Sequence, residues 1–401
     1  MHRKLTPEQA IAILAREDVC SFIQDNLSTD TSRLLLNPPQ EFRDSIQLVA
    51  DQIIARKKSK KKIPDWFANP DLIFPPPLSI EQASSSTTSL YKKGIYSGEI
   101  LIDLTGGAGV DFLALSDNFK RCVYVDDNPY LGALIEYNSK HLEKKIEVVS
   151  SDSENYISTL TGTNYHFFID PARRDKAAAR VFRIEDSSPN LLHLLPDFQR
   201  LKALVLIKLS PLLEIHSILS AFPSVQAIHV VSIKNECKEI LVHLDFNKKS
   251  ANKPHIYCVN LETKHEDFQF DLDQEKVTSL SYNLTQKYVY EPNSSIMKAG
   301  GFKSIGKHFQ LAKLAPNTHF YTSDILYQRF PGKVFKILAS FREERIEQFA
   351  EKRHINVISR NHPMNATAIK KKYRLKDGGS DFLLAFRDYT GSAKMYFASL
   401  A

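Results

Sequence analysis

The sequence is poor in the residues that mark a secreted or metal-binding protein. It has only four cysteines, Cys20, Cys122, Cys237 and Cys258, which lie far apart and form no CxxC pair. This spacing offers neither a zinc site nor a disulfide framework. No run approaches the roughly 18 apolar residues of a membrane span, and the opening MHRKLTPEQAIAILARED carries charges where a secretory signal is apolar. We therefore expect a cytoplasmic protein with reduced thiols, no bound metal and no membrane contact.

The length of the chain exceeds what one hydrophobic core supports. A single hydrophobic core rarely extends beyond roughly 250–300 residues, so a chain of 401 residues is expected to form two or three domains. Hydrophobic residues make up 43% of the sequence and charged residues 25%. This balance is ordinary for a folded protein and excludes extensive disorder.

Basic residues are concentrated in the last third of the chain. Residues 283–401 contain 20 Lys and Arg against 9 Asp and Glu, a balance of +11. Subtraction from the totals of 53 and 46 leaves residues 1–282 with 33 and 37, a balance of −4. Such asymmetry favours a polyanion-binding region at this end. A solvated surface without a partner is the alternative.

Helices are expected in the first part of the chain. The segments PEQAIAIL and EFRDSIQLVADQIIARKK place apolar residues at three- and four-residue spacing, with acids early and bases late. We assign residues 1–78 to an N-terminal helical domain. The basic run RKKSKKK (56–62) is either a nucleic-acid contact or a solvated helix end, and Pro and Ser interrupt regular structure after it.

Short apolar strands then alternate with helical segments. The strand candidates are EILIDL, RCVYVD, KIEVVSSD, YHFFID, ALVLIKL and AIHVVSI. This alternation predicts an α/β fold, with a mostly parallel sheet covered by helices on both faces. The segment AIHVVSIKNECKEILVHLDF is expected to form an antiparallel hairpin that closes the sheet edge. We place this domain at residues 79–275.

The remaining, basic part of the chain predicts one or two small α+β units. Strand patterns occur in KYVYEPNSSIMKAGGF, KVFKILASF, INVISR, DFLLAFRD and AKMYFASL. The segments EERIEQFAEKRH and NATAIKKKYRL are expected to be helices.

A glycine-rich turn, DLTGGAGVD (103–111), follows the first strand of the α/β region. Glycine lets the backbone approach a ligand closely because it has no side chain to obstruct it. The dinucleotide fingerprint GxGxxG requires a third glycine where Phe112 stands, so an NAD-dependent dehydrogenase ranks last among the functions considered. The turn resembles motif I of the class I S-adenosylmethionine-dependent methyltransferases, with Asp103, Gly107 and Gly109 in the pattern D-x-x-x-G-x-G.

Acidic residues also end the next three strands, as Asp126, Asp152 and Asp170. Each of them alone is explained equally well as a helix cap. Ligands of open α/β sheets bind at the carboxyl ends of the strands, however, so the four acids are expected to line one crevice. The resemblance implies S-adenosylmethionine as cofactor, with Asp103 near its amino group, Asp126 on its ribose and Asp152 on its adenine. The expected cofactor-binding residues are Asp103, Thr105, Gly107, Gly109, Asp126, Asn128 and Asp152.

The segment FIDPARRD (168–175) ends the fourth strand, which faces the methyl donor in this fold. Methyl transfer is an in-line displacement that depends on near-attack contact and requires no metal. Asp170-Pro171 matches half of [DNS]-P-P-[YFW], with which related enzymes orient a base nitrogen. Arg173 departs from the other half, and this departure leaves the methylated atom open. The expected catalytic residues are Asp170, Pro171, Arg173 and Lys208.

Two further features bear on the reaction. Lys208 ends the fifth strand, where it is expected to pair with Asp170 or Glu185 or to bind a substrate phosphate. DPxR also occurs in carbon-5 RNA methyltransferases, but these use a cysteine soon after a later strand, where LVLIKLSPLL has none. Carbon-5 chemistry is therefore disfavoured, although Cys237 leaves it open.

A longer set of motifs narrows the resemblance. DLTGGAGVD, DPARRD, RVFRIEDSSPN, KLSP, NECKE and YEPNSSIMKAG together resemble a Bacteroidetes family of class I methyltransferases with a THUMP-like C-terminal part, over most of the chain from about residue 80. The resemblance implies a small α+β ferredoxin-like linker domain at 276–330 and a THUMP-like RNA-binding domain at 331–401. It also implies methylation of a structured RNA, tRNA or rRNA, on a base nitrogen. The expected substrate-binding residues are Arg174, Arg183, Glu185, Lys371, Lys372 and Arg374.

Two other functions remain open on the sequence. The protein is alternatively an RNA-binding protein whose methyltransferase fold is vestigial, or a methyltransferase of a small molecule or a protein whose basic tail serves oligomerisation. The presence of all the expected donor-binding acids and glycines favours a retained enzyme.

Overall fold

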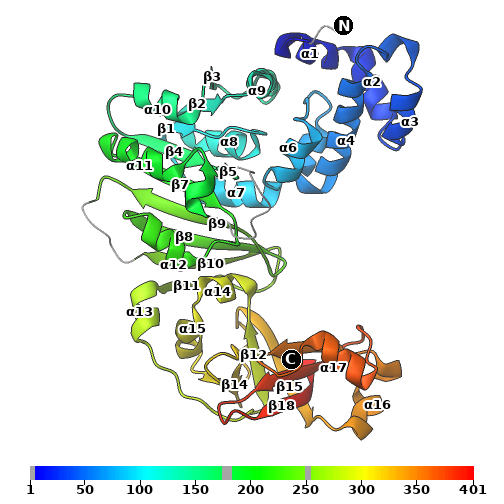
Figure 1. Cartoon of the computed structure of the whole chain (residues 1–401), viewed down its shortest axis with the longest axis vertical. Coiled ribbons are helices and arrows are strands. Elements are labelled where there is room, and N and C mark those ends of the chain that lie inside the picture. The colour runs from blue at the N-terminus through cyan, green and yellow to red at the C-terminus, as the bar shows by residue number, and fades with distance from the viewer. Residues whose placement is uncertain (1–4, 174–182, 249–253) are drawn as a thin grey trace. The chain divides into compact units, whose positions relative to one another are not determined.

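The computed structural model describes residues 5–173, 183–248 and 254–401, and the chain divides into two compact units (Figure 1). The segments of unit 1 are Met1–Leu209, Ser217–Val225 and Val242–Ser250. The segments of unit 2 are Ser210–His216, Gln226–Leu241 and Ala251–Ala401. All the residues expected to bind the donor fall in unit 1, and the basic C-terminal region falls in unit 2.

Unit 1 begins with the expected helices, which are short and packed together. Their bounds are α1 (Pro7–Leu14), α2 (Glu17–Asp25), α3 (Thr31–Leu36), α4 (Ile46–Lys62), α5 (Pro64–Ala68), α6 (Pro77–Gln82) and α7 (Ser86–Ile95). Thr6 starts α1 because its hydroxyl accepts a hydrogen bond from the amide of Gln9. Ile11 and Ile53 are buried in one core cluster with Leu134 of α9 (Pro129–His141). The helical region thus shares its core with the α/β part of the unit.

The basic run 56–62 lies in the second half of α4 and serves the fold. The Arg56 guanidinium is buried, lies over the Phe74 ring and donates to the carbonyl oxygens of Pro70 at 2.9 Å and Leu72 at 2.6 Å. Lys62 donates to the carbonyl oxygen of Ile80 at 2.9 Å. Arg56 and Lys62 are therefore neither nucleic-acid contacts nor a solvated helix end. Both cations donate hydrogen bonds to backbone carbonyl groups of the chain that follows the helix.

At 17 residues, α4 is the longest helix in the described ranges. Within these ranges, none of the helices combines the length and the apolar character needed to cross a membrane.

The expected parallel sheet is confirmed in unit 1. Its strands run in the order β7-β4-β1-β2-β3, and all neighbouring pairs in this series are parallel. Ile102 of β1 lies opposite Val123 of β2 and Phe167 of β4, and all three side chains are buried. The strand bounds are β1 (Gly98–Asp103), β2 (Phe119–Asp126), β3 (Glu147–Ser150), β4 (Tyr165–Ile169) and β7 (Leu204–Leu209).

Helices cover both faces of these strands, as the alternating pattern requires. Figure 1 shows α8 and α9 on one side of the strands and α10 and α11 on the other. Their bounds, with that of the following helix, are α8 (Val110–Leu115), α10 (Ser153–Thr159), α11 (Leu191–Arg200) and α12 (Ile215–Ala221). The loops after β1, β2 and β3 lead into α8, α9 and α10, and Asn128 and Asp152 lie at the starts of the last two helices.

The expected hairpin forms, because β8 (Val225–Ile233) and β9 (Glu236–Asp245) are neighbouring strands joined only by Lys234 and Asn235, but the expectation that it closes the sheet edge is wrong. Beyond β8 lies β10 (His255–Leu261), which pairs with β8 in parallel, and β11 (Phe268–Asp271) follows antiparallel to β10. The β10 segment HIYCVNL buries Ile256, Cys258 and Val259. Its apolar core is only a few residues long within a charged stretch of chain, so the sequence pattern did not identify it.

Unit 2 also contains a seven-stranded sheet in the order β13-β14-β12-β15-β18-β17-β16, mostly antiparallel, with β16 and β17 parallel. The strand bounds are β12 (Tyr288–Pro292), β13 (Ala312–Lys313), β14 (Tyr321–Ser323), β15 (Gly332–Ser340), β16 (Asn356–Arg360), β17 (Asp381–Arg387) and β18 (Ala393–Leu400). The helix bounds are α13 (Leu272–Val277), α14 (Ser294–Ala299), α15 (Phe302–His308), α16 (Ile346–Phe349) and α17 (Ala366–Tyr373).

The continuous helix expected over EERIEQFAEKRH is broken. The α-helical part, α16, ends at Phe349 between the 3₁₀ turns Glu343–Arg345 and Glu351–Arg353, and the chain then reverses at Lys352 and Arg353, whose φ angles of 49° and 62° are left-handed. This reversal brings Ile355 into the buried cluster that also contains Ile346 and Ala350. Burial of the apolar side chains therefore overrides the helical propensity of the segment.

A cluster of buried rings in unit 1 contains a histidine that is kept neutral. The Tyr96 hydroxyl donates to the carbonyl oxygens of Phe167 at 3.0 Å and Leu204 at 2.9 Å. The ring of His243 stands edge-on to that of Tyr96, with centroids 5.9 Å apart. Burial lowers the pKa of His243 to about 4.

We expect His243 to make unit 1 sensitive to acid. Its folded-state pKa lies below the unfolded value of about 6.5, so its stabilising effect is fully present above that pH and is lost as the pH falls toward 4. The loss is up to about 3 kcal/mol. Urea unfolding midpoints measured at pH 7 and pH 5 should differ less for His243→Gln than for the native chain.

The exposed His193 provides the control. His193→Gln should keep the native pH dependence of the midpoint. An equal pH dependence for His243→Gln and His193→Gln would contradict the prediction.

Candidate functional site

The carboxyl group of Asp103 is buried at the end of β1, with 1% of the residue exposed. One of its oxygens accepts hydrogen bonds from the Thr105 amide at 2.9 Å and the Thr105 hydroxyl at 3.3 Å. Burial, and then the nearby carboxylates of Asp111, Asp170 and Asp126, raise the pKa of Asp103 well above its usual range. Acids from three strand ends and from α8 are therefore close enough to influence one another. In the described part of the chain, no group of His, Cys, Asp and Glu side chains has the arrangement of a metal site.

The glycine turn between β1 and α8 has a backbone that other residues would strain or obstruct. Gly107 and Gly109 have positive φ of 52° and 76°. A Cβ atom added to Gly106 would lie 2.2 Å from the ring of Tyr124, whose hydroxyl donates to the carbonyl oxygen of Gly107 at 2.7 Å. The turn is thus held tightly against β2, with no side chains from its glycines.

The carboxylate of Asp126 at the end of β2 is held by the backbone. One oxygen accepts from the Gly107 amide at 2.8 Å and the other from the Asn128 amide at 2.9 Å. Each oxygen retains a lone pair for a further donor. The side chain is half-buried, and burial raises its pKa. Asn128 caps α9 by accepting from the Tyr130 amide at 3.0 Å, so its side chain is committed to the helix start.

Asp152, at the end of β3, is a helix cap. Its side chain is exposed and starts α10, where one oxygen accepts from the Asn155 amide at 2.8 Å and the other from the Asn155 side chain. Asp152 thus serves as a helix cap, which was the alternative considered for each acid on its own. The contact of Asp152 with adenine stays a prediction.

Asp170, at the end of β4, is fixed at two points. Its amide donates to the Thr105 hydroxyl at 2.7 Å, and its carboxylate accepts from the Lys208 ammonium at 2.5 Å. Thr105 therefore connects Asp103 with Asp170, and Lys208 adopts one of its two expected pairings. The structure brings together Asp103, Thr105, Gly107, Asp126, Asp170 and Lys208.

The segment after Asp170 continues through Pro171 into a small ribbon. Here β5 (Ala172–Arg173) pairs antiparallel with β6 (Ser187–Ser188). Arg174 lies outside the described residues. Arg183 and Glu185 are both exposed, and Glu185 lies in a 3₁₀ turn, Ile184–Asp186, that is anchored by the buried Ile184. Both residues are accessible to a substrate, as the prediction requires.

Three polar residues that were not predicted complete the surroundings of Lys208. Asp111 in α8, Lys92 in α7 and Ser84 are all buried. The Lys92 ammonium lies 3.2 Å from one Asp111 oxygen, and the Ser84 hydroxyl donates to the other at 2.6 Å. Asp111 comes just after the glycines of the turn, so its position in the sequence could have identified it as a site residue. Lys92 and Ser84 lie in segments whose sequence gives no indication that they contact the site.

The basic residues predicted to bind substrate in unit 2 are accessible. Lys371 and Lys372 are exposed on α17, and Arg374 is exposed at its end. Tyr373 of the same helix packs edge-on against Phe341, with ring centroids 4.8 Å apart. The basic side chains of this helix are therefore better placed than its aromatic ring to meet a ligand.

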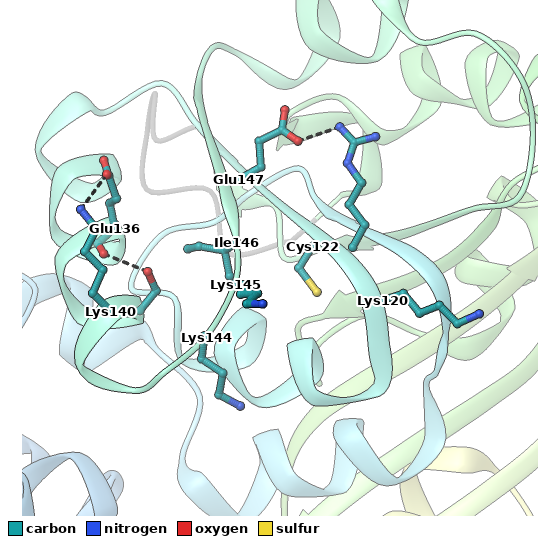
Figure 2. A pocket seen from close by; sticks show the side chains of 10 residues that line it. Lys120, Cys122, Glu136, Lys140, Lys144, Lys145, Ile146 and Glu147 are labelled. Atoms are coloured by element: carbon teal, nitrogen blue, oxygen red, sulfur yellow. Dashed lines mark hydrogen bonds and ion pairs between the residues drawn. The ribbon is translucent and has the colours of Figure 1, made fainter.

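A surface depression lies at the amino ends of β2 and β3, the opposite ends of these strands from the acids. In Figure 2, Glu147 meets an arginine, Arg121, at 2.6 Å, and Lys140 meets Glu136 at 3.0 Å. Burial raises the pKa of the Cys122 thiol to about 11, so it stays protonated at neutral pH. The depression holds none of the predicted site residues and no activated nucleophile, and we assign the site to the carboxyl ends. It is lined by Lys120, Arg121, Cys122, Glu136, Ser139, Lys140, Lys144, Lys145, Ile146 and Glu147.

Comparison with protein families matches two adjacent segments of unit 2. Residues 288–331 match a ferredoxin-like domain, and residues 332–399 match a THUMP domain-like family. The comparison with curated proteins gave no match.

Comparison with solved structures covers nearly the whole chain. A crystal structure of a candidate methyltransferase from Porphyromonas gingivalis W83 superposes with a TM-score of 0.84 and 29% identity, over 96% of this chain and 98% of that one. Two others have TM-scores of 0.29. An rRNA methylase from Streptococcus thermophilus is 14% identical and covers 40% of this chain and 93% of its own. A candidate methyltransferase from Streptococcus mutans in complex with SAH is 13% identical and covers 39% of this chain and 94% of its own.

The comparisons agree with the geometry of both units. The sheet of parallel strands is the one expected from the resemblance, and the structure from Porphyromonas gingivalis extends the likeness to the basic region. The chain is therefore a protein of the class I methyltransferase fold with a ferredoxin-like segment and a THUMP-like domain in its C-terminal third.

Proposed function

We propose that the protein transfers the methyl group of S-adenosylmethionine to a base nitrogen of a structured RNA, tRNA or rRNA. The observation that carries the proposal is the gathering of Asp103, Asp126 and Asp170 around one glycine turn, at the ends of neighbouring parallel strands. Ligands of open α/β sheets bind at this edge.

The charge and shape of the turn suit this donor. S-adenosylmethionine carries an ammonium and a sulfonium, and the clustered carboxylates that raise the pKa of Asp103 favour a cation beside them. Asp126 offers a free lone pair on each oxygen to the two ribose hydroxyls. The bare backbone of Gly107 and Gly109 gives the close approach that the ligand needs. When bound, the donor supplies the methyl group as an electrophile.

The residues at the end of β4 are suited to orient a nucleophile. The carboxylate of Asp170 can accept a hydrogen bond from an amino group of a base and direct its lone pair along the in-line path. Lys208 holds this carboxylate in place through a charge-assisted hydrogen bond. Pro171 fixes its own φ and restricts the backbone of Asp170, which precedes it.

The basic region of unit 2 supports RNA as the substrate. Lys371, Lys372 and Arg374 project from one helix end in a region with a balance of +11, and they lie in the segment that matches a THUMP domain-like family. Cations arranged in this way bind a phosphate backbone and release its counterions.

Methyl transfer is tested directly with radiolabelled S-adenosylmethionine and total RNA from cells of the source organism that lack the gene. We expect label in RNA, and mass spectrometry of the digested RNA should place it on a base nitrogen. Asp170→Asn should abolish transfer while donor binding stays near native. Native donor binding without labelled RNA would indicate another substrate, and no donor binding would indicate a vestigial fold.

The donor site is tested by calorimetry with S-adenosylmethionine. Asp126→Ala should weaken binding at least roughly tenfold, because hydrogen bonds to a charged acceptor contribute about 1.5–3 kcal/mol each. The exposed neighbour Asp127 supplies the control, since Asp127→Ala should bind the donor nearly as well as the native chain. Equal affinities for Asp126→Ala and Asp127→Ala would remove Asp126 from the site.

RNA capture is tested through its salt dependence. Replacing Lys371, Lys372 and Arg374 together by Gln should weaken the binding of unfractionated tRNA and lower the slope of log K against log salt by about 2, since each phosphate contact contributes roughly 0.7–0.9. The matched control replaces the exposed Lys120, Lys140 and Lys145 of unit 1. Equal slopes for the two triple variants would place RNA binding elsewhere.

A further inference from the structure

Four charged side chains of alternating sign form a continuous series from the core of unit 1 to its surface. Lys92 and Asp111 are 3.2 Å apart, Asp111 and Lys208 are 3.8 Å apart, and Lys208 and Asp170 are 2.5 Å apart. Their side chains are 0%, 8%, 13% and 37% exposed in this order. The series therefore ends at the residue proposed to orient the nucleophile.

Asp111 is the central link of this series. Its carboxylate receives the Ser84 hydroxyl at 2.6 Å and lies between the ammonium groups of Lys92 and Lys208. Lys92 also donates to the Ser84 hydroxyl at 3.2 Å, which joins Ser84, Lys92 and Asp111 in one hydrogen-bonded group. Burial alone would raise the pKa of Asp111, but the two ammonium groups and these hydrogen bonds outweigh burial and lower this pKa. Asp111 is thus a fixed anion at neutral pH.

The stability of the fold alone does not explain why Ser84, Lys92 and Asp111 are buried together. Buried ion pairs stabilise a fold little, because the cost of removing two charges from water offsets their attraction, and apolar residues of similar size often serve equally well. A buried cation and anion do, however, fix the geometry of whatever they contact. On its more exposed side Asp111 contacts Lys208, which is also paired with Asp170 at the exposed end of the series.

We propose that Asp111 is a positioning residue for methyl transfer, which holds the ammonium of Lys208 against Asp170 and is itself fixed by Lys92 and Ser84. This inference rests on the proposed function and adds three residues to its machinery. None of the three is required to touch the donor or the RNA.

The same arrangement couples the donor-binding turn to the reacting end of the site. Asp111 lies two residues after Gly109, and Thr105 lies two residues before Gly107. Thr105 holds the amide of Asp170, while Asp111 holds its carboxylate through Lys208. Both supports of Asp170 thus come from the turn that is proposed to receive the donor, so a displacement of the turn would displace Asp170 as well.

The first test is the kinetics of Asp111→Asn with labelled S-adenosylmethionine and total RNA. We expect kcat to fall by about 100-fold, the cost of a misplacement on the order of 1 Å, while KM for RNA and the donor affinity by calorimetry stay near native. Asp111→Glu should recover part of kcat. An unchanged kcat in Asp111→Asn would overturn the proposal, as would a loss confined to donor affinity.

Two further variants guard against simple unfolding. Ser84→Ala removes one hydrogen bond from Asp111 and should lower kcat several-fold with a near-native melting temperature. Asp117→Asn breaks the half-exposed pair of Asp117 with Lys93, the residue next to Lys92 in α7, and should leave kcat unchanged. If Ser84→Ala retained full activity while Asp111→Asn failed to fold, Asp111 would be a structural residue only.

A double variant distinguishes the positioning of Lys208 by Asp111 from the neutralisation of Lys92 by Asp111. Lys92→Met with Asp111→Asn removes one charge of each sign and leaves Lys208 paired with Asp170. If Asp111 serves only as the counter-ion of Lys92, this double variant should regain the native kcat. We expect it to stay as slow as Asp111→Asn, because Lys208 has lost its tether; full recovery would overturn the proposal.

The link between Asp111 and Lys208 can also be measured without any substrate. Reductive methylation with formaldehyde and a borane, read by peptide mass spectrometry, should modify Lys208 several-fold faster in Asp111→Asn than in the native chain or Asp117→Asn. Unchanged reactivity of Lys208 would overturn the proposal whatever the kinetics show. Failure of the native chain to label RNA would instead reject the proposed function, and the two failures are thus distinguishable.

Discussion

The buried carboxyl group of Asp103 is the constraint around which unit 1 is arranged. A carboxyl group in this position is costly unless hydrogen bonds satisfy it, and the amide and hydroxyl of Thr105 do so. These bonds fix the start of the glycine turn, and the turn in turn supplies an amide to Asp126 and a hydroxyl to the amide of Asp170. The ends of three strands are thus joined through one short loop, and the site depends on the shape of that loop.

Charge is distributed differently in the two units. In unit 1, Lys92, Asp111, Lys208 and Asp170 near the strand ends are paired and mostly buried, so they act over short distances and set geometry. In unit 2, Lys371, Lys372 and Arg374 at the end of α17 are exposed, and exposed cations act on a partner through the field that they share. One chain therefore combines a rigid polar interior, proposed to orient a nucleophile, with a solvated basic helix, proposed to capture RNA.

The sequence predicted the parts of the structure that local patterns determine. The parallel strands followed from apolar runs that end in acids, and the clustering of Asp103, Asp126 and Asp170 followed from the shared edge of such strands. Lys92 and Ser84 could not be identified, because their importance comes from contacts with Asp111, 19 and 27 residues away in the sequence. The burial of Arg56 within a run of solvated cations, and the strand β10 within a charged stretch, depend in the same way on contacts with distant parts of the chain.

The close approach of Gly106 to Tyr124 limits what the gene can encode at this position. Even the smallest side chain would push the aromatic ring away and release the carbonyl oxygen that the phenol holds. Substitutions of glycine by alanine that an exposed loop would accept are thus excluded at this buried position by steric overlap alone. This restriction would apply even to a homologue without catalytic activity, because the contact between Gly106 and Tyr124 belongs to the fold.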